Sequence, residues 1–202
     1  MTSLRDRKRE RTRRALVEAA TELFETRGYD ETTVADIAAA AEIGTRTFFS
    51  YFASKEEVLF PEADARIAAA VEAVATRTPG ETPAEVLVRT LTDLGPAADE
   101  MLGRTAALRL RLTATVPAVR GRGLQLQLDA QREIARHLRD AFPDQLDEVS
   151  AGALVGAFIG AVTGALQAIL DRPGALDGDP AAMREDLKAA TKVALRPWTQ
   201  AE

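Results

Sequence analysis

The stretch Thr33 to Phe52, TVADIAAAAEIGTRTFFSYF, predicts two short helices separated by a tight turn. The first is expected over residues 34–41, because Thr33 can cap the open backbone N–H groups and Asp36 occupies the third helical position. The second is expected over residues 45–52 and carries four aromatic residues in eight. So many aromatic side chains on one short helix indicate a face that both anchors the helix and contacts a partner.

The sequence on either side of this stretch predicts two longer helices. Over residues 12–27 the apolar positions have the spacing of an amphipathic helix: Leu16, Ala19, Ala20, Leu23 and Phe24. After the stretch, Ser54 and Glu57 form a capping-box pattern that begins the next helix. This helix is expected to continue to about Ala75, with a disturbance at Pro61.

The rest of the chain alternates helical patterns with turn signals. A segment rich in Pro and Gly, residues 78–83, marks the first clear break. Beyond it, helices are expected over residues 83–94, 97–115, 118–141, 145–171 and 180–196. The predicted fold class is all-α with about nine helices. We expect a small three-helix N-terminal domain over residues 1–60 and a larger helical domain over residues 61–202.

The amino-acid composition excludes several kinds of chemistry. The 202 residues include no cysteine and a single histidine, His137, which leaves no disulfide, thiolate ligand or cysteine nucleophile. We therefore expect no metal and no cofactor. The charged N-terminus lacks the apolar core of a secretory signal, so a cytoplasmic protein is expected.

The net charge of −5 hides an uneven distribution. Residues 1–14 contain seven Arg and Lys against two Asp and Glu, whereas residues 56–202 contain 16 against 22. A basic arm on an acidic body is expected when one end of a protein meets phosphate and the other does not. A solvated tail is the alternative interpretation of the arm.

Residues 149–170 form a run of 22 residues without a charge, which is long enough to cross a bilayer. The run contains many small residues, lacks Trp or Tyr at its ends and has flanks without a basic bias, so a soluble helix buried on nearly all sides is the better interpretation. Four glycines recur at every fourth position: Gly152, Gly156, Gly160 and Gly164. They form one stripe that lets another backbone approach closely, either within the chain or from a second copy across a dimer interface.

The motifs from Arg11 to Phe60 together resemble the DNA-binding domain of the TetR (tetracycline repressor) family. The resemblance is carried by Ala19-Ala20-x-x-Leu23-Phe24, Gly28-Tyr29, Thr32-Thr33-Val34-x-Asp36-Ile37-Ala38, Thr47-Phe48-Phe49-Ser50-Tyr51-Phe52 and Ser54-Lys55-Glu56. The acidic helical remainder is similar to that family's ligand-binding and dimerisation domain. Two positions depart from the family pattern. Glu42 replaces the usual turn glycine and is expected to need a positive φ, and Gly44 replaces the usual serine cap.

The resemblance implies which side chains contact DNA. Those on the groove side are Thr45, Arg46, Thr47, Phe49, Ser50 and Tyr51, and those at backbone phosphates are Thr33 and Lys55. Arginine can offer a bidentate fork to guanine, and threonine can contact a base edge or a thymine methyl group. Phe48 and Phe52 lie at i and i+4 on one helix face, so we expect them in the core. For Phe49 and Tyr51, core packing and DNA contact are equally open.

The central helices of the remainder are far richer in aliphatic than in aromatic residues. By the resemblance they surround a ligand pocket, whose candidate lining residues are Leu91, Leu108, Arg109, Leu112, Leu128 and Phe158. An aliphatic lining suits a small hydrophobic, acyl-type effector. Residues 109–122 also resemble actinobacterial regulators of the mycofactocin type, which respond to acyl-coenzyme A. The alternative is that the leucines form core and the arginines a solvated face.

The sequence patterns and the resemblance to the TetR family together predict a ligand-responsive transcriptional regulator. This regulator is expected to be a repressor that binds a palindromic operator as a homodimer. The expected partners are double-stranded DNA, a small-molecule effector and a second copy of the chain. An enzyme is not expected, since the single histidine lies among arginines on a polar helix face. A membrane-associated or helical interaction module is the third alternative, and it depends on residues 149–170 alone.

Overall fold

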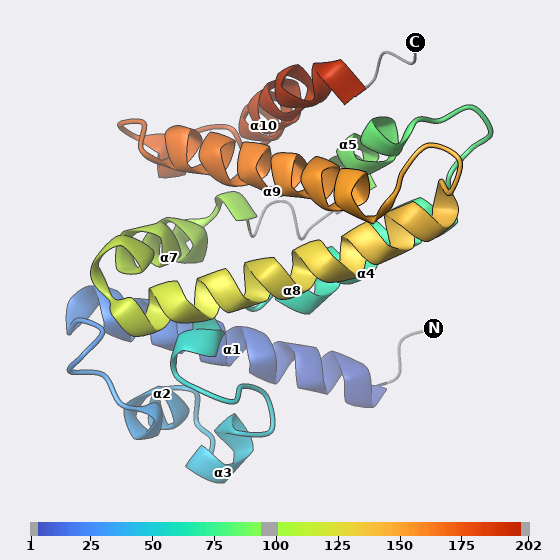
Figure 1. Cartoon of the computed structure of the whole chain (residues 1–202). Coiled ribbons are helices and arrows are strands. Elements are labelled where there is room, and N and C mark those ends of the chain that lie inside the picture. The colour runs from blue at the N-terminus through green and yellow to red at the C-terminus, as the bar shows by residue number, and fades with distance from the viewer. Residues whose placement is uncertain (1–3, 94–100, 199–202) are drawn as a thin grey trace. The chain divides into compact units, whose positions relative to one another are not determined.

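The computed structural model describes residues 4–93 and 101–198. The described residues form nine α-helices and no β-strand, which confirms the predicted all-α class (Figure 1). The chain divides into two compact units: residues 1–61 with 104–123, and residues 62–103 with 124–202. The predicted break at Gly95-Pro96 lies outside the described residues.

The first unit contains the N-terminal helices and a later segment of the chain. Its elements are α1 (Leu4–Thr26), α2 (Val34–Ala40), α3 (Thr45–Phe48), the 3-10 turn η1 (Glu56–Leu59), α7 (Arg104–Thr115) and the start of α8 (Pro117–Ala141). Helix α1 packs against α2, η1 and α7, and α2 packs against α3. The three N-terminal helices therefore share one core with residues that follow about forty positions later in the chain.

Helix α1 is longer than its apolar pattern predicts. It begins at Leu4, so the basic segment of residues 5–14 is helical. The predicted apolar stripe is confirmed, because Leu16, Ala20 and Phe24 are buried. Gly28 follows with a φ of 93°, which glycine adopts without the steric cost that other residues carry.

The single helix predicted over residues 54–75 is interrupted. Residues 56–59 form only η1, and α4 (Ala63–Ala75) begins after a gap, although it ends where predicted. Phe60 leaves the helical region with a φ of −125° and a ψ of 47°. The break follows from Pro61, since a proline has no N–H and disfavours helical backbone at the preceding residue.

Ser54 does not cap η1 as the capping-box pattern predicted. Lys55 occupies the cap position and makes no side-chain cap hydrogen bond. The Glu57 carboxylate nevertheless reaches back and accepts a hydrogen bond from the Ala53 N–H. The expected capping box is therefore absent, because Glu57 bonds the N–H of Ala53 and not that of Ser54.

Helix α7 contacts η1 through a buried charge. The guanidinium of Arg109 donates a hydrogen bond of 3.0 Å to the Leu59 carbonyl and lies 5.6 Å from the centre of the Phe60 ring. At the start of α8, Arg122 forms an ion pair with Glu57. The Arg109 bond satisfies a carbonyl that the end of a short helix leaves open. Both contacts join parts of the chain that sequence patterns did not connect.

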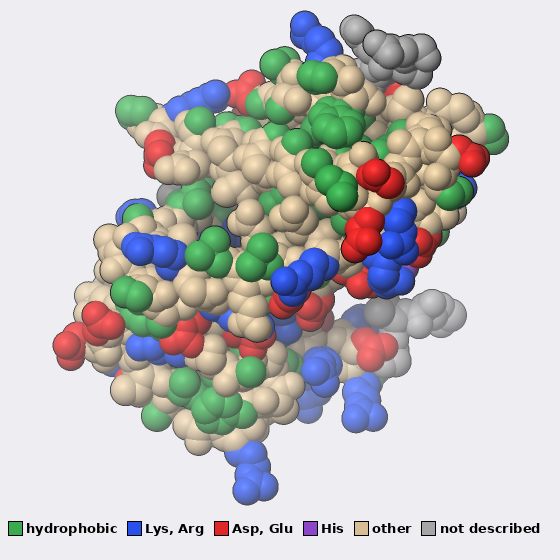
Figure 2. Space-filling view, in the orientation of Figure 1, with side chains coloured by type: hydrophobic (Ala, Val, Ile, Leu, Met, Phe, Trp, Pro, Cys, Tyr) green, Lys and Arg blue, Asp and Glu red, His purple; other side chains and the backbone are tan. Residues whose placement is uncertain are grey.

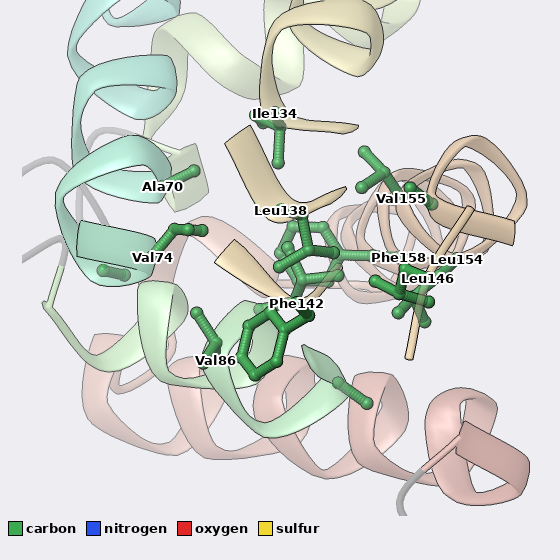
Figure 3. Close-up of a cluster of buried hydrophobic side chains, with 14 of the residues drawn as sticks. Ala70, Val74, Val86, Ile134, Leu138, Phe142, Leu146, Leu154, Val155 and Phe158 are labelled. Carbon is green, nitrogen blue, oxygen red and sulfur yellow. The ribbon is translucent and has the colours of Figure 1, made fainter. Parts of the chain in front are cut away.

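The second unit consists of α4, α5 (Pro83–Asp93), the remainder of α8, α9 (Glu148–Leu170) and α10 (Pro180–Leu195). Its larger apolar cluster gathers side chains from all five helices around Leu138 on α8 and Phe142, which directly follows the last residue of α8 (Figure 3). Val86 from α5 and Phe158 from α9 pack into the same cluster. This cluster confirms that the aliphatic residues of the remainder build a core.

Helix α9 is less buried than predicted. It packs against α10 and α5 on one side through residues such as Leu154, Val155 and Phe158. On the other side Val149 is 78% exposed, and Gly160 and Gly164 are also exposed. The expectation of burial on nearly all sides is wrong for the single chain, because the described residues cover only one face of this helix.

Candidate nucleic-acid interface

The N-terminus of α2 is fixed by a complete capping box. The Thr33 hydroxyl accepts a hydrogen bond of 3.2 Å from the Asp36 N–H, and the Thr33 N–H donates one of 2.9 Å to the Asp36 carboxylate. The Thr33 hydroxyl also donates to the Asp36 carboxylate. This bond, the bond from the Thr33 N–H and the charge of Arg27 at 3.8 Å hold the pKa of Asp36 below its usual range. The cap that the sequence predicted is therefore confirmed, and it includes a charged carboxylate.

The turn between α2 and α3 is built around Glu42. This residue has a φ of 56°, the left-handed conformation that its place in the sequence predicted. The Glu42 N–H donates to the Ala39 carbonyl at 3.0 Å, and the Ile43 N–H donates to the Ala38 carbonyl at 2.9 Å. These two bonds form a Schellman motif, which normally has glycine at this position. The turn thus satisfies the open carbonyls of α2 at the cost of strain in one glutamate.

Two aromatic rings anchor the second helix of the motif. Phe48 is 0% exposed and Phe52 is 2% exposed, and their ring centres lie 5.9 Å apart. Only residues 45–48 are regular α-helix, but backbone hydrogen bonds continue through Phe52, which accounts for the longer helix that was predicted. The expected core role of both rings is confirmed.

The α3 segment is open to solvent outside its two anchors. Its exposed residues are Thr45, Arg46, Thr47, Phe49 and Ser50, and Tyr51 is half-buried beside them. Phe49 is 56% exposed and packs edge-on against Phe48 at 5.4 Å between ring centres. All six residues predicted for the groove side are therefore accessible on α3 or in the turn that follows it. Gly44 caps α3 with extended backbone and makes no side-chain bond.

Lys55 has contacts that the resemblance did not imply. Its ammonium donates hydrogen bonds to the carbonyls of Tyr29 (2.7 Å) and Thr32 (2.9 Å), and it lies 3.9 Å from the centre of the Tyr29 ring. The Tyr29 hydroxyl donates to the Glu56 carboxylate at 2.5 Å, and burial together with this bond raises the pKa of Tyr29. Lys55 thus fixes the loop that leads into Thr33, the other residue implied at a phosphate.

Sequence patterns missed two arginines beside this surface. Arg9 on α1 places its guanidinium 5.3 Å from the centre of the Tyr51 ring. Arg13, one turn later, lies 4.7 Å from the Phe52 ring centre and donates to the Pro61 carbonyl at 2.5 Å. In Figure 2 the Lys and Arg side chains gather around the N-terminal end of α1. The sequence feature that could have identified these arginines is the four-residue spacing of Arg5, Arg9 and Arg13 within the basic arm, which puts them on one side of a helix.

The six candidate pocket residues fall in both compact units. In the first unit Leu108 and Arg109 are buried and Leu112 is half-buried. In the second unit Phe158 is buried, Leu91 is half-buried between two apolar clusters, and Leu128 is 51% exposed. The structure therefore does not bring the six together within one unit, and the pocket stays a prediction.

The glycine stripe of α9 has little cover from the chain itself. A methyl group at Gly156 would lie 3.0 Å from the amide nitrogen of Gln131, whose side chain also donates to the Gly152 carbonyl at 3.2 Å. Methyl groups at Gly152, Gly160 and Gly164 would meet nothing within 4 Å. Among the described residues no second helix backbone comes within 4 Å of these methyl positions, and only the Gly152 and Gly156 end of the stripe has a side chain of α8 beside it.

The single histidine contacts two charged side chains of its own helix. The Nε2 atom of His137 lies 3.0 Å from the Glu133 carboxylate, one helical turn earlier, and 3.0 Å from the Arg136 guanidinium. This arrangement is an exposed network along one face of α8. Within residues 4–93 and 101–198, no group of three or more metal-ligating side chains is placed to hold an ion.

The N-terminal residues match a known family. Residues 16–60 fit the model of "Bacterial regulatory proteins, tetR family". This range contains the anchored end of α1, the capped α2, the Glu42 turn, α3 and η1. The match therefore covers the same elements that build the exposed α3 surface.

A longer match extends beyond this domain. The chain is 38% identical over 138 residues to the HTH-type transcriptional regulator TcmR of Streptomyces glaucescens. The matched region is 66% of this chain and 61% of TcmR, so the chain spans less than two thirds of that relative. The likeness thus continues into the helices that follow the N-terminal domain.

Solved structures share the whole fold. One is the TetR-family repressor FadR of Thermus thermophilus in complex with lauroyl-CoA, with a TM-score of 0.57, 23% identity and coverage of 94% of this chain and 96% of that one. Another is the SmeT–triclosan complex, with a TM-score of 0.58, 22% identity and coverage of 94% and 92%. At these identities the likeness shows the fold alone.

Proposed function

Because this chain belongs to the TetR family of bacterial regulatory proteins, we propose that it is a ligand-responsive transcriptional repressor that binds a palindromic operator as a homodimer. The observation that supports this proposal most is the α3 surface. Two buried phenylalanines anchor the α3 segment, and a capping box and a Schellman turn fix the backbone of α2 and of the turn that leads into α3. The six predicted contact residues are accessible on α3 or directly after it. The family consists of regulators rather than enzymes, and the chemistry of this surface is recognition.

Each side chain at the surface has a distinct proposed role. Arg46 reads a guanine through its guanidinium fork, and Thr45 and Thr47 contact base edges or thymine methyl groups. Tyr51 and Lys55 hold backbone phosphates, since two of the three ammonium protons of Lys55 go to carbonyls and one remains for a phosphate. These contacts place α3 in a major groove.

The homodimer is proposed to form across α9. The face of this helix that carries Gly160 and Gly164 is uncharged and exposed, and small residues allow two helices to approach closely. Figure 2 shows few charged side chains over the middle of α9. In such a dimer the two α3 helices enter successive major grooves about 34–36 Å apart. A dimer therefore explains both the apolar face and the need for a palindromic site.

The proposed effector is a small hydrophobic molecule of the acyl type. Four of the six candidate lining residues are leucines, and FadR, which shares the fold, was solved with lauroyl-CoA. SmeT was solved with triclosan, so a compact aromatic molecule is the alternative. The effector releases DNA only if it binds better to dimers whose α3 spacing no longer fits the operator.

Because the proposed partner is DNA, we also propose that the protein is cytoplasmic. Helix α9 is long and apolar enough to cross a membrane by length and composition alone. Its packing against α10 and α5 supports a soluble helix with one face in the core. The cytoplasmic location thus follows from the proposed function and not from α9 itself.

A binding experiment tests the DNA-reading role of α3. Duplexes are first selected by the wild-type protein from a random-sequence library, and affinity is then measured for selected and scrambled duplexes at several salt concentrations. Arg46→Ala is expected to reduce the discrimination between them by about 1–3 kcal/mol. Arg132→Ala, which removes an exposed arginine from the second unit, is the matched control and is expected to change little. Salt-independent binding, or none, by the wild-type protein would contradict the proposal.

The effector class is tested separately. Native mass spectrometry of protein purified from its own host is expected to show a retained molecule with an acyl chain. A retained compact aromatic compound would contradict the acyl-type effector and leave the regulator proposal intact.

A further inference from the structure

The arginines of α1 divide into two sets on different faces of the helix. Arg5, Arg9 and Arg13 follow each other at intervals of four and therefore lie along one side. Arg7, Arg11 and Arg14 lie on another side, where with Asp6 and Glu10 they line a shallow surface hollow. The two sets carry the same charge in the same helix but have different neighbours.

The first set is attached to the end of the α3 segment. Arg13 is half-buried, and its guanidinium is held by the Phe52 ring and by the Pro61 carbonyl. Arg9 is exposed, lies 5.3 Å from the centre of the Tyr51 ring, and approaches the Ser50 carbonyl at 3.5 Å. Arg13 thus holds α1 beside the aromatic anchors. Arg9, one turn earlier on α1, extends towards solvent.

Arg9 and Tyr51 offer complementary donors to one anion. A guanidinium presents five N–H groups in a planar fork that matches two phosphate oxygens, and a phenol adds one O–H donor. Contact with the ring face limits the positions that Arg9 can occupy and so lowers the entropy that it loses on binding. A phosphate group is large enough and rich enough in acceptor oxygens to bond both side chains at once.

We propose that Arg9 and Tyr51 form a single phosphate clamp at the edge of the α3 surface, and that Arg5 extends this clamp one turn further along α1. The inference rests on the proposed DNA-binding function and adds two residues of α1, Arg9 and Arg5, to the proposed DNA contacts. The ligand is a phosphate of the DNA backbone, so the clamp sets affinity and register but reads no base.

The main alternative is that the seven basic residues of the arm act as a diffuse positive field. A field depends on net charge near the DNA and not on which side of α1 carries it. A clamp depends on position, on the shape of the cation and on the tyrosine hydroxyl. These three dependences separate the two explanations.

Dependence on the position of the cation is tested by comparing Arg9→Gln with Arg11→Gln. These two substitutions remove the same charge from opposite sides of α1. Binding to a selected duplex is measured by fluorescence anisotropy over a range of salt concentrations. The clamp predicts that Arg9→Gln weakens binding about tenfold and lowers the slope of log K against log salt by about 1. Arg11→Gln is expected to weaken binding by less than about twofold.

Shape and coupling are tested by Arg9→Lys and Tyr51→Phe. Lysine keeps the charge but not the fork, so Arg9→Lys is expected to bind nearly as weakly as Arg9→Gln. Tyr51→Phe keeps the ring and removes the hydroxyl. The clamp predicts that the effects of Arg9→Gln and Tyr51→Phe do not multiply, so that the double variant binds no more than about threefold more weakly than the worse single variant. Circular dichroism and urea unfolding of each variant check whether it remains folded.

Equal losses for Arg9→Gln and Arg11→Gln, or multiplied losses in the double variant, would overturn the clamp in favour of a diffuse field. In either case the wild-type protein still binds in a salt-dependent manner, and the proposed function stands. If the wild-type protein binds no duplex with salt dependence, the proposed function fails and the clamp fails with it.

Discussion

Helices α3 and α9 bury their apolar side chains to very different extents. The aromatic anchors of the α3 segment are almost wholly enclosed by their own unit, with exposures of 0% for Phe48 and 2% for Phe52. Helix α9 is apolar along its length, yet residues such as Val149 and Gly160 face solvent. The position of α3 is therefore set within one chain, whereas α9 has an apolar face that residues 4–93 and 101–198 leave open. This difference supports the proposal that one surface of the protein reads DNA and that another pairs with a second copy of the chain.

The largest expected effect comes from removing an α3 anchor. Phe48→Ala is expected to lower the free energy of unfolding by about 3–5 kcal/mol, because it deletes a fully buried ring. The neighbouring Phe49→Ala removes a mostly exposed ring and is expected to change stability by less than about 1 kcal/mol. Urea unfolding of both variants measures the difference. Similar losses at the two positions would show that α3 is not anchored as described.

The next largest effect is expected from a substitution on the open face of α9. Gly160→Leu places a large side chain where the chain itself leaves space, so the monomer is expected to stay folded, with helix propensity favouring leucine over glycine. The proposed dimer is expected to weaken at least about tenfold, which sedimentation over a concentration series measures. Gly121→Leu, at another helical glycine with open space around it, is the matched control. An unchanged dimer in Gly160→Leu would exclude this stripe from the interface.

A smaller effect is expected at the strained turn. Glu42→Gly relieves a positive φ and is expected to stabilise the protein by about 1 kcal/mol or less, since glycine also gains entropy in the unfolded chain. Ala39→Gly introduces the same residue at a helical position of α2 and is expected to destabilise by about 1 kcal/mol. Thermal and urea unfolding report both signs. Destabilisation by Glu42→Gly would contradict the account of this turn.

The smallest effect is the pH dependence of the α2 cap. The folded pKa of Asp36 lies below its unfolded value of about 3.9, so its contribution is complete above that value and is lost as the pH falls through the folded pKa. Asp36→Asn is expected to be less stable than the wild type at neutral pH, and the difference is expected to shrink in acid. Urea midpoints across this range test the trend, with Glu31→Gln as a charge-matched control just outside the cap. A difference that grows in acid would contradict the sign.

The features that the sequence predicted correctly depend on residues close together in the chain. The Thr33 and Asp36 box, the positive φ of Glu42 and the i, i+4 anchors each involve at most a few neighbouring positions. Local backbone geometry determines these features, so local patterns were sufficient to predict them. The same holds for the C-terminal end of α4 and the start of α5.

The features that were missed depend on contacts between distant segments or on competing local signals. Arg9 meets Tyr51 and Arg109 meets Leu59 across more than forty residues, and no periodicity encodes such pairs. At Ser54 a capping-box pattern competed with Pro61, and the proline determined where the helix breaks. For α9, composition indicated burial, but it could not separate burial in the core from burial against a second chain.

The most direct test of the central claim is the DNA sequence that the protein selects. The full-length protein is incubated with a random-sequence duplex library, and bound DNA is enriched over several rounds and sequenced. Two α3 surfaces joined through α9 predict an inverted repeat whose half-site centres lie one helical turn, about 34–36 Å, or a multiple of that distance apart. Loss of this repeat with Arg46→Ala is also expected. Enrichment of an unrepeated site, or no enrichment at all, would contradict the account of a dimeric DNA-reading protein.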